Sequence, residues 1–155
     1  MKQLFAVLFL PISTVFVPGS TDDADALKPG TCCVDDSVSL IPAYLKVSEA
    51  LVTDDLQSAI DAAEDLGLWA ECSNEEHLDE SVADLERSRN LTEARIAFRE
   101  ISLEVIQLTR WIPGHHVMTC PMADADWIQI ESEVSNPYYG STMVRCGKIK
   151  ESIGM

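Results

Sequence analysis

The sequence predicts a mainly α-helical protein, an antiparallel helical bundle that carries a loop-rich C-terminal cap with short β segments. Apolar residues recur every three or four positions over 38–68, 78–85 and 94–108, which is typical of helices that bury one face. Two of these stretches follow a Ser or Asn that has Glu three residues later, a pattern of helix starts. After Gly114 the helical period ends, and Pro and Gly residues separate short β-like segments.

The first helical stretch, 38–68, is predicted to form one long helix or two nearly collinear ones. Thr53 and Asp54 interrupt its apolar face, so we expect a cap for a second segment there. Gly67 indicates the end of the stretch. The adjacent Asp54 and Asp55 fit a cap followed by a first-turn acid that favours the helix dipole, with a ligand pair as the alternative.

Capping patterns predict where the later helices begin. Ser73 with Glu76 matches a capping box and is expected to open the third helix. Asn90 with Glu93 is a second cap pattern, and the helix that follows is expected to run to about Arg110.

The N-terminus resembles a secretory signal peptide. A positive residue, Lys2, precedes an apolar run that Pro11 interrupts, and Pro18-Gly19-Ser20 follows. The run is too short for a membrane span, so we predict a signal peptide over 1–20, cleaved as late as residue 26, and no membrane span after its removal. The mature protein is then expected to be periplasmic or secreted.

The remaining chain divides into a linker and a domain. Residues 21–37 have no apolar period and are rich in Asp, which predicts a flexible acidic linker. Residues 38–150 form the predicted helical domain with its Cys/Met cap. A net charge of −15 excludes general nucleic-acid binding, which requires clustered Lys and Arg, and argues against docking on anionic lipid.

The cysteine count matters because cysteines in an oxidising compartment normally form disulfides. The chain has 5, so at least one cannot pair within the chain. Cys32 and Cys33 are adjacent in the linker and are poor partners for each other. Cys72 stands beside the predicted third helix, with His77 nearby, but the second pair of a zinc site is missing.

Two Cys/Met pairs form the candidate site. Cys120 and Met122 flank Pro121, which stiffens the pair, and Met143 precedes Cys146 by three residues. Thiolate and thioether together are the ligands that select Cu(I), and imidazole is a supplementary donor. His115 and His116 precede the first pair closely and are candidates for that role. Copper, as Cu(I), is therefore the cofactor that this pattern favours.

A disulfide is the alternative explanation of the same residues. Cys120 and Cys146 could pair and close the cap, contributing roughly 3 kcal/mol. Met122 and Met143 would then be packing residues. Composition and spacing alone slightly favour the disulfide, with the copper site as the alternative.

An aromatic turn lies between the two pairs. Asn136 before Pro137 favours an extended or turn conformation, and Gly140 can adopt positive φ. Between them, Tyr138 and Tyr139 are expected to pack against Trp127. We interpret this structural motif as architecture that holds the sulfur-bearing loops together.

The C-terminal motifs stand in the following order: Cys120-Pro121-Met122, Trp127, Asn136-Pro137-Tyr138-Tyr139-Gly140, Met143 and Cys146-Gly147. Together with helical residues such as Arg95 and Phe98, this order resembles a bacterial domain family of formally unknown function. That family occurs as small secreted proteins and at the C-terminus of periplasmic adaptor subunits of CusB-like heavy-metal efflux pumps. The resemblance covers about 38–148 and implies an exported helical domain linked to copper or silver handling.

Two functions follow as hypotheses. The first is an exported, non-enzymatic heavy-metal-binding module for Cu(I) or Ag(I), partnered by an efflux adaptor or another envelope protein. The second is a disulfide-stapled envelope protein-interaction module without metal. An enzyme is not expected, because the common hydrolase, metalloprotease and phosphate-loop motifs are missing from the sequence.

Overall fold

The computed structural model describes the backbone of residues 36–155 and the side chains of residues 40–155. The predicted signal peptide, the linker as far as residue 35, and Cys32 and Cys33 lie outside the described residues. Four helices come first, and three strands and a short 3₁₀ helix follow. Their bounds are α1 Asp36–Val52, α2 Leu56–Ser73, α3 Glu76–Glu86, α4 Leu91–Thr109, β1 His115–Cys120, β2 Ala125–Gln129, η1 Gly140–Thr142 and β3 Lys148–Ile153.

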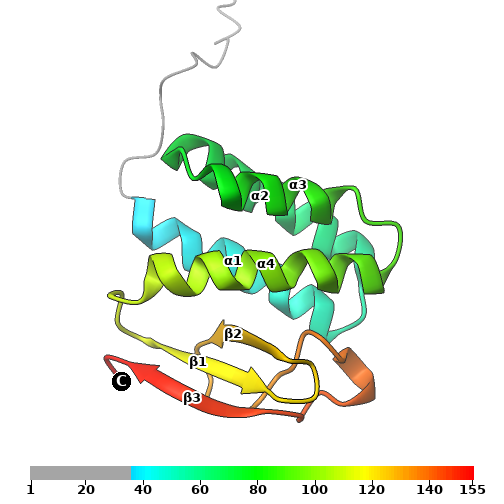
Figure 1. The fold of residues 1–155 in the computed structure, drawn as a ribbon, viewed down its shortest axis with the longest axis vertical. Helices are drawn as coiled ribbons and strands as arrows, with labels where there is room; N and C mark the ends of the chain where they lie inside the picture. The colour runs from blue at the N-terminus through cyan, green and yellow to red at the C-terminus, as the bar shows by residue number, and fades with distance from the viewer. Residues whose placement is uncertain (1–35) are drawn as a thin grey trace, which may run out of the picture. The chain divides into compact units, whose positions relative to one another are not determined.

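The elements stack in three layers (Figure 1). Helices α2 and α3 form the layer farthest from the sheet, α1 and α4 form the middle layer, and the three strands form the third. Successive helices run in opposite directions. The four helices and the small sheet of the described residues confirm the predicted mainly α fold with a short β cap. Within residues 36–155, no helix has the length and apolar character needed to cross a bilayer.

The prediction of collinear helices over 38–68 was wrong, because α1 and α2 fold back and pack against each other. The chain turns at Asp54, which adopts a left-handed φ of 60°. Asp55, rather than Thr53 or Asp54, caps α2, and its carboxylate accepts from the Ser58 backbone N–H at 3.0 Å. The apolar period continues across the turn because both helices bury a face in the same core.

The predicted boundary between the second and third helices was also inexact. Gly67 lies inside α2, which continues to Ser73. Ser73 does not cap α3: its buried hydroxyl has no hydrogen-bond partner, and Asn74 ends α2 in the left-handed conformation with φ 58°. Asn90 caps α4 as predicted and accepts from the Glu93 N–H at 3.0 Å.

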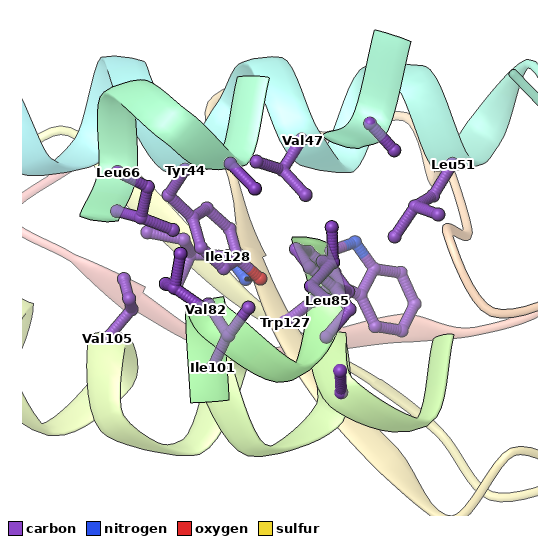
Figure 2. Close-up of a cluster of buried hydrophobic side chains, with 14 of the residues drawn as sticks. Tyr44, Val47, Leu51, Leu66, Val82, Leu85, Ile101, Val105, Trp127 and Ile128 are labelled. Atoms are coloured by element: carbon purple, nitrogen blue, oxygen red, sulfur yellow. Dashed lines mark hydrogen bonds between the residues drawn. The ribbon is translucent and has the colours of Figure 1, made fainter. Parts of the chain in front are cut away.

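One apolar core joins the layers (Figure 2). Every helix supplies fully buried side chains, and so does β2. The labelled examples are Tyr44, Val47 and Leu51 from α1, Leu66 from α2, Val82 and Leu85 from α3, Ile101 and Val105 from α4, and Trp127 and Ile128 from β2. Burial of this size is what holds helices of ordinary propensity together.

The sheet has the order β2-β1-β3, and both pairings are antiparallel. Met118 lies opposite Trp127, and Cys120 lies opposite Ala125 at the turn of the β1–β2 hairpin. A bulge at Val117/Met118 shifts the register with β3. Both Val117 and Met118 are buried, so β1 has protein on both faces and does not show the alternation of a half-exposed strand.

The segment between β2 and β3 supplies part of that second cover. Gly147 has a φ of 140°, and a Cβ at this position would lie 2.8 Å from the Trp127 ring and 3.0 Å from the Thr119 carbonyl. Only glycine therefore allows the chain to run this close to the sheet. This approach also determines where the neighbouring Cys146 lies.

Candidate functional site

Three sulfur atoms meet at the turn end of the β1–β2 hairpin. The Sγ atoms of Cys120 and Cys146 are 3.0 Å apart, and both residues are thiols. The Met122 Sδ lies 3.8 Å from the Cys146 Sγ. We call Cys120, Met122 and Cys146 the sulfur site. The sulfur site contains both residues of the predicted Cys120/Met122 pair and only Cys146 of the predicted Met143/Cys146 pair.

The three sulfurs differ in access to solvent. Cys120 ends the central strand and is fully buried, Cys146 is half-buried, and Met122 is 65% exposed. Cys120 also lines a pocket of about 300 Å³, and Arg99, Asp126 and Lys150 are among the other lining residues. The site therefore extends from a fully buried sulfur at Cys120 to a largely exposed one at Met122.

Asn136 holds the Cys146 segment against the hairpin. Its side-chain Nδ2 donates to the Cys146 carbonyl at 2.6 Å, and its Oδ1 accepts from the Tyr138 N–H at 2.8 Å. Its backbone N–H donates to the Val144 carbonyl at 2.8 Å. Asn136 is fully buried, so these bonds are worth more than they would be at the surface.

The surroundings shift the pKa values of the two thiols in opposite directions. Burial opposes ionisation of Cys120, but hydrogen bonds from Cys146, from the backbone N–H groups of Ala123 and Met122, and from Asn136 outweigh it and lower the pKa of Cys120. The hydrogen bond to Cys120, followed by burial and the Cys120 charge, raises the pKa of Cys146. Of the two thiols, Cys120 is therefore the one that these contacts favour to lose its proton first.

The turn that carries Met122 is tied down from two sides. The Tyr139 hydroxyl donates to the Met122 carbonyl at 3.1 Å. From α4, the Arg99 guanidinium donates to the Ala123 carbonyl. The Met122 backbone is thus fixed, while its side chain stays largely in solvent.

An ion pair connects the helices to the loop before Cys146. Arg95 of α4 lies 2.5 Å from the Asp54 carboxylate and donates to the Leu51 carbonyl at 3.0 Å and to the Pro137 carbonyl at 2.8 Å. The Asp54 carboxylate also accepts from the Ser141 hydroxyl and from its backbone N–H at 3.1 Å. These hydrogen bonds, first that of the Ser141 hydroxyl and then that of Arg95, lower the pKa of Asp54.

Gly140 makes this junction possible. It has a φ of 52°, and a Cβ on it would collide with the Asp54 carboxylate and the Arg95 guanidinium. The loop can approach the ion pair only because this residue has no side chain.

Tyr138 and Trp127 lie in the core, whereas Tyr139 is half-buried and, among the described residues, makes no ring contact with Trp127, contrary to the prediction. Tyr138 packs edge-on against Trp127, with ring centroids 6.0 Å apart, as the sequence predicted, and it also contacts Phe98 at 5.8 Å. Its hydroxyl donates to the Asp126 carbonyl at 2.8 Å and lies 3.1 Å from the Ser102 hydroxyl. Burial, the largest cause, raises the pKa of Tyr138 above its ordinary range. Tyr138 and Trp127 are therefore buried parts of the fold.

The two predicted histidines lie at the other end of β1. His116 is about 13 Å along the strand from Cys120 and hydrogen-bonds the Ser152 hydroxyl at 2.9 Å. His115 is 1% exposed, and neither ring nitrogen makes a hydrogen bond of ordinary geometry. Burial, and then the neighbouring His116, lower the pKa of His115. This arrangement does not bring the imidazoles to the sulfur site.

Met143 lies one turn before Cys146 and is half-buried. Its carbonyl accepts from the Cys146 N–H at 3.0 Å, so its backbone helps to shape the turn. Cys72 lies in the last turn of α2 and is remote in sequence from the sulfur site. Over residues 36–155, no group of three or more His, Cys, Asp or Glu side chains that could hold a metal ion occurs. The sulfur site has only two such residues, and its third donor is a thioether.

Sequence reasoning missed the polar residues that support the site. The pairing of Asp54 with Arg95 spans 41 residues, and the contact of Arg99 with Ala123 spans 24. Arg95 and Arg99 are four residues apart and therefore share one helix face. That spacing was visible, but it did not indicate which carbonyls the two guanidinium groups would bind.

The helical half of the chain is similar to a recognised family. Residues 40–112 match a family described as "Protein of unknown function (DUF3347)". The match covers nearly all of α1 and the whole of α2, α3 and α4, and it ends before β1, so it does not include the sulfur site. Neither the curated proteins nor the solved structures contain a significant match to this chain.

Proposed function

We propose that this protein binds a soft monovalent metal ion, Cu(I) or Ag(I), through Cys120, Met122 and Cys146, as an exported module without enzymatic activity. The observation that carries the proposal is the convergence of two thiols and a thioether, with separations of 3.0 and 3.8 Å. Thiolate and thioether ligands select Cu(I), whereas hard cations prefer oxygen. Zinc gains little from a thioether, so the donor set favours the monovalent ions.

The spacing of the sulfurs supports the proposal with one small adjustment. Metal–sulfur bonds of about 2.3 Å place two sulfurs of a three-coordinate site about 4 Å apart. The 3.8 Å between Met122 and Cys146 already matches this separation. The thiols of Cys120 and Cys146 would have to part by about 1 Å, which rotation of the half-buried Cys146 side chain can supply.

The wider features of the chain fit metal handling outside the cytoplasm. A net charge of −15 attracts cations over the whole surface. The N-terminal sequence is typical of an exported protein, and the motif order resembles domains attached to heavy-metal efflux adaptors. An efflux adaptor or another envelope protein is thus the expected partner for delivering or receiving the metal.

The two predicted thioethers provide a direct test. Met122→Leu removes a sulfur of the site while keeping an apolar side chain at an exposed position, so we expect the affinity for Cu(I) to fall by about tenfold or more. Met143→Leu is the matched control, because only the backbone of Met143 bonds to Cys146. Competition titrations with a chromogenic Cu(I) chelator measure both variants. Equal affinities for Met122→Leu and wild type would remove Met122 from the ligand set.

A disulfide-stapled interaction module is the second candidate function. The 3.0 Å contact between Cys120 and Cys146 favours it, because little movement separates this pair from a covalent bond. Thiol counting on protein purified without reductant, and again after reduction, distinguishes the two functions. Two fewer thiols before reduction, together with no copper binding afterwards, would favour the staple over the metal site.

A further inference from the structure

A groove of about 450 Å³ lies between the second half of α1 and the segment that follows β2. None of its lining residues belongs to the sulfur site. Its volume falls in the range of pockets that hold small molecules. Among the large apolar side chains that line it, Ile130 is 48% exposed, although it directly follows a buried strand.

The wall formed by residues 129–135 is held in place by the buried carboxamide of Gln129. The Gln129 Oε1 accepts from the Trp127 indole N–H at 3.1 Å and from the Ser135 N–H at 3.2 Å. Its Nε2 donates to the Glu133 carbonyl at 2.9 Å and to the Glu131 carbonyl. With both ends of the side chain bonded, this segment is ordered and the groove is preformed.

The chemistry of the lining limits what can occupy the groove. Leu45 and Val52 of α1 and Ile130 give it an apolar floor. Glu49 on one side and Glu131 on the other are exposed carboxylates. Of the described residues that line the groove, none is Lys or Arg, so the charge of its walls is negative. An apolar body gains from the floor, and a positive end gains from the two carboxylates.

We propose that this groove binds a small amphiphile with an apolar chain and a single cationic head. The apolar chain lies on Leu45, Val52 and Ile130, and the head lies between Glu49 and Glu131. The volume favours a small molecule over a protein partner, and the charge of the lining favours a cation over a fatty acid.

The test uses the full mature chain without metal and three probes of equal length: octylammonium, octanol and octanoate. Amide chemical shifts in ¹H–¹⁵N spectra locate binding and measure affinity. We expect saturable shifts over residues 45–53 and 129–135, with octylammonium binding about tenfold more tightly than octanoate. Glu49→Gln with Glu131→Gln should remove that preference, and Glu80→Gln, an exposed change on α3, should leave it intact.

Substitutions at the apolar lining residues of the groove provide a second test. Val52→Trp should fill the groove and abolish binding. Ile130→Ser, at a side chain that is already 48% exposed, weakens the floor and keeps the test available if the larger substitution impairs folding. Absence of saturable shifts with octylammonium, equal binding of octanoate, or binding of a basic amphipathic peptide without binding of octylammonium would overturn the proposal. Copper takes no part, so this test is independent of the metal site.

Discussion

The helices and the C-terminal cap are held together by different kinds of interaction. In α1–α4, fully buried side chains recur at helical spacing, and the hydrogen bonds are mainly those of the helix backbones and their caps. In residues 115–153, buried polar side chains such as Asn136 and Gln129 bond to distant carbonyls and N–H groups. The helical part is therefore stabilised mainly by burial, whereas the cap combines buried apolar side chains such as Trp127 and Ile128 with specific directional contacts.

Because the two regions are held differently, substitutions in them should have different effects. A bundle of apolar faces tolerates volume-conserving substitutions, since burial is not directional. A loop that has to hold Cys146 3.0 Å from Cys120 and 3.8 Å from Met122 depends on a few hydrogen bonds. Changes in the helices should thus alter the free energy of unfolding, whereas changes in the cap should alter the sulfur site.

The largest effect is expected in the helical core. Leu66→Ala removes a fully buried side chain of α2 and should lower the free energy of unfolding by about 2–5 kcal/mol. Leu68→Ala on the same helix is the control, because Leu68 is 61% exposed and its loss should cost under about 0.5 kcal/mol. Chemical denaturation measures both, and similar costs for the two variants would contradict the placement of the core.

A substitution in the cap should have a smaller effect on stability and a larger one on the site. Asn136→Ala leaves the Cys146 carbonyl without its partner and should cost about 1–3 kcal/mol. The Cys146 thiol should also react faster with a thiol reagent, because its segment is released. Asn90→Ala removes the cap of α4 at a cost of about 1 kcal/mol and should leave the thiol rate unchanged. Equal thiol rates in both variants would show that Asn136 does not position Cys146.

The smallest effect concerns the junction between the two regions. The pKa of Asp54 is lower in the folded protein than in the unfolded chain, so its contribution to stability is fully present above about pH 4 and is lost as the pH falls through its folded pKa. Asp54→Asn should be less stable than wild type at pH 6, with the gap narrowing towards pH 2. Urea denaturation across this range measures the gap, and a gap independent of pH would exclude the Asp54 charge as its cause.

The sequence predicted the helices well because their information is periodic and local. The apolar spacing located three helical stretches, which contain the helices α1 to α4, and Asn90 marked the start of α4. The errors lie at positions where contacts between residues distant in sequence determine the path of the chain. Asp54 turns the chain back because Arg95 and Ser141 bind its carboxylate, and these partners are 41 and 87 residues away.

The sulfur site was predicted in part for the same reason. Residue type and spacing identified Cys120, Met122 and Cys146 as candidate soft ligands. The pairing of β1 with β3, in which Thr119 lies opposite Lys148, brings Cys120 and Cys146 together. The histidines were grouped with them because they are close in sequence. An extended strand separates nearby residues by about 3.4 Å per position, so closeness in sequence did not become closeness in space.

Anaerobic titration of the fully reduced protein with Cu(I), against a competing chelator, tests the central claim most directly. We predict one Cu(I) bound per chain, with binding lost in Cys120→Ser and in Cys146→Ser and retained in His116→Ala. If the wild-type protein, with its thiols counted as reduced, binds no stoichiometric copper, the sulfur site is not a metal site.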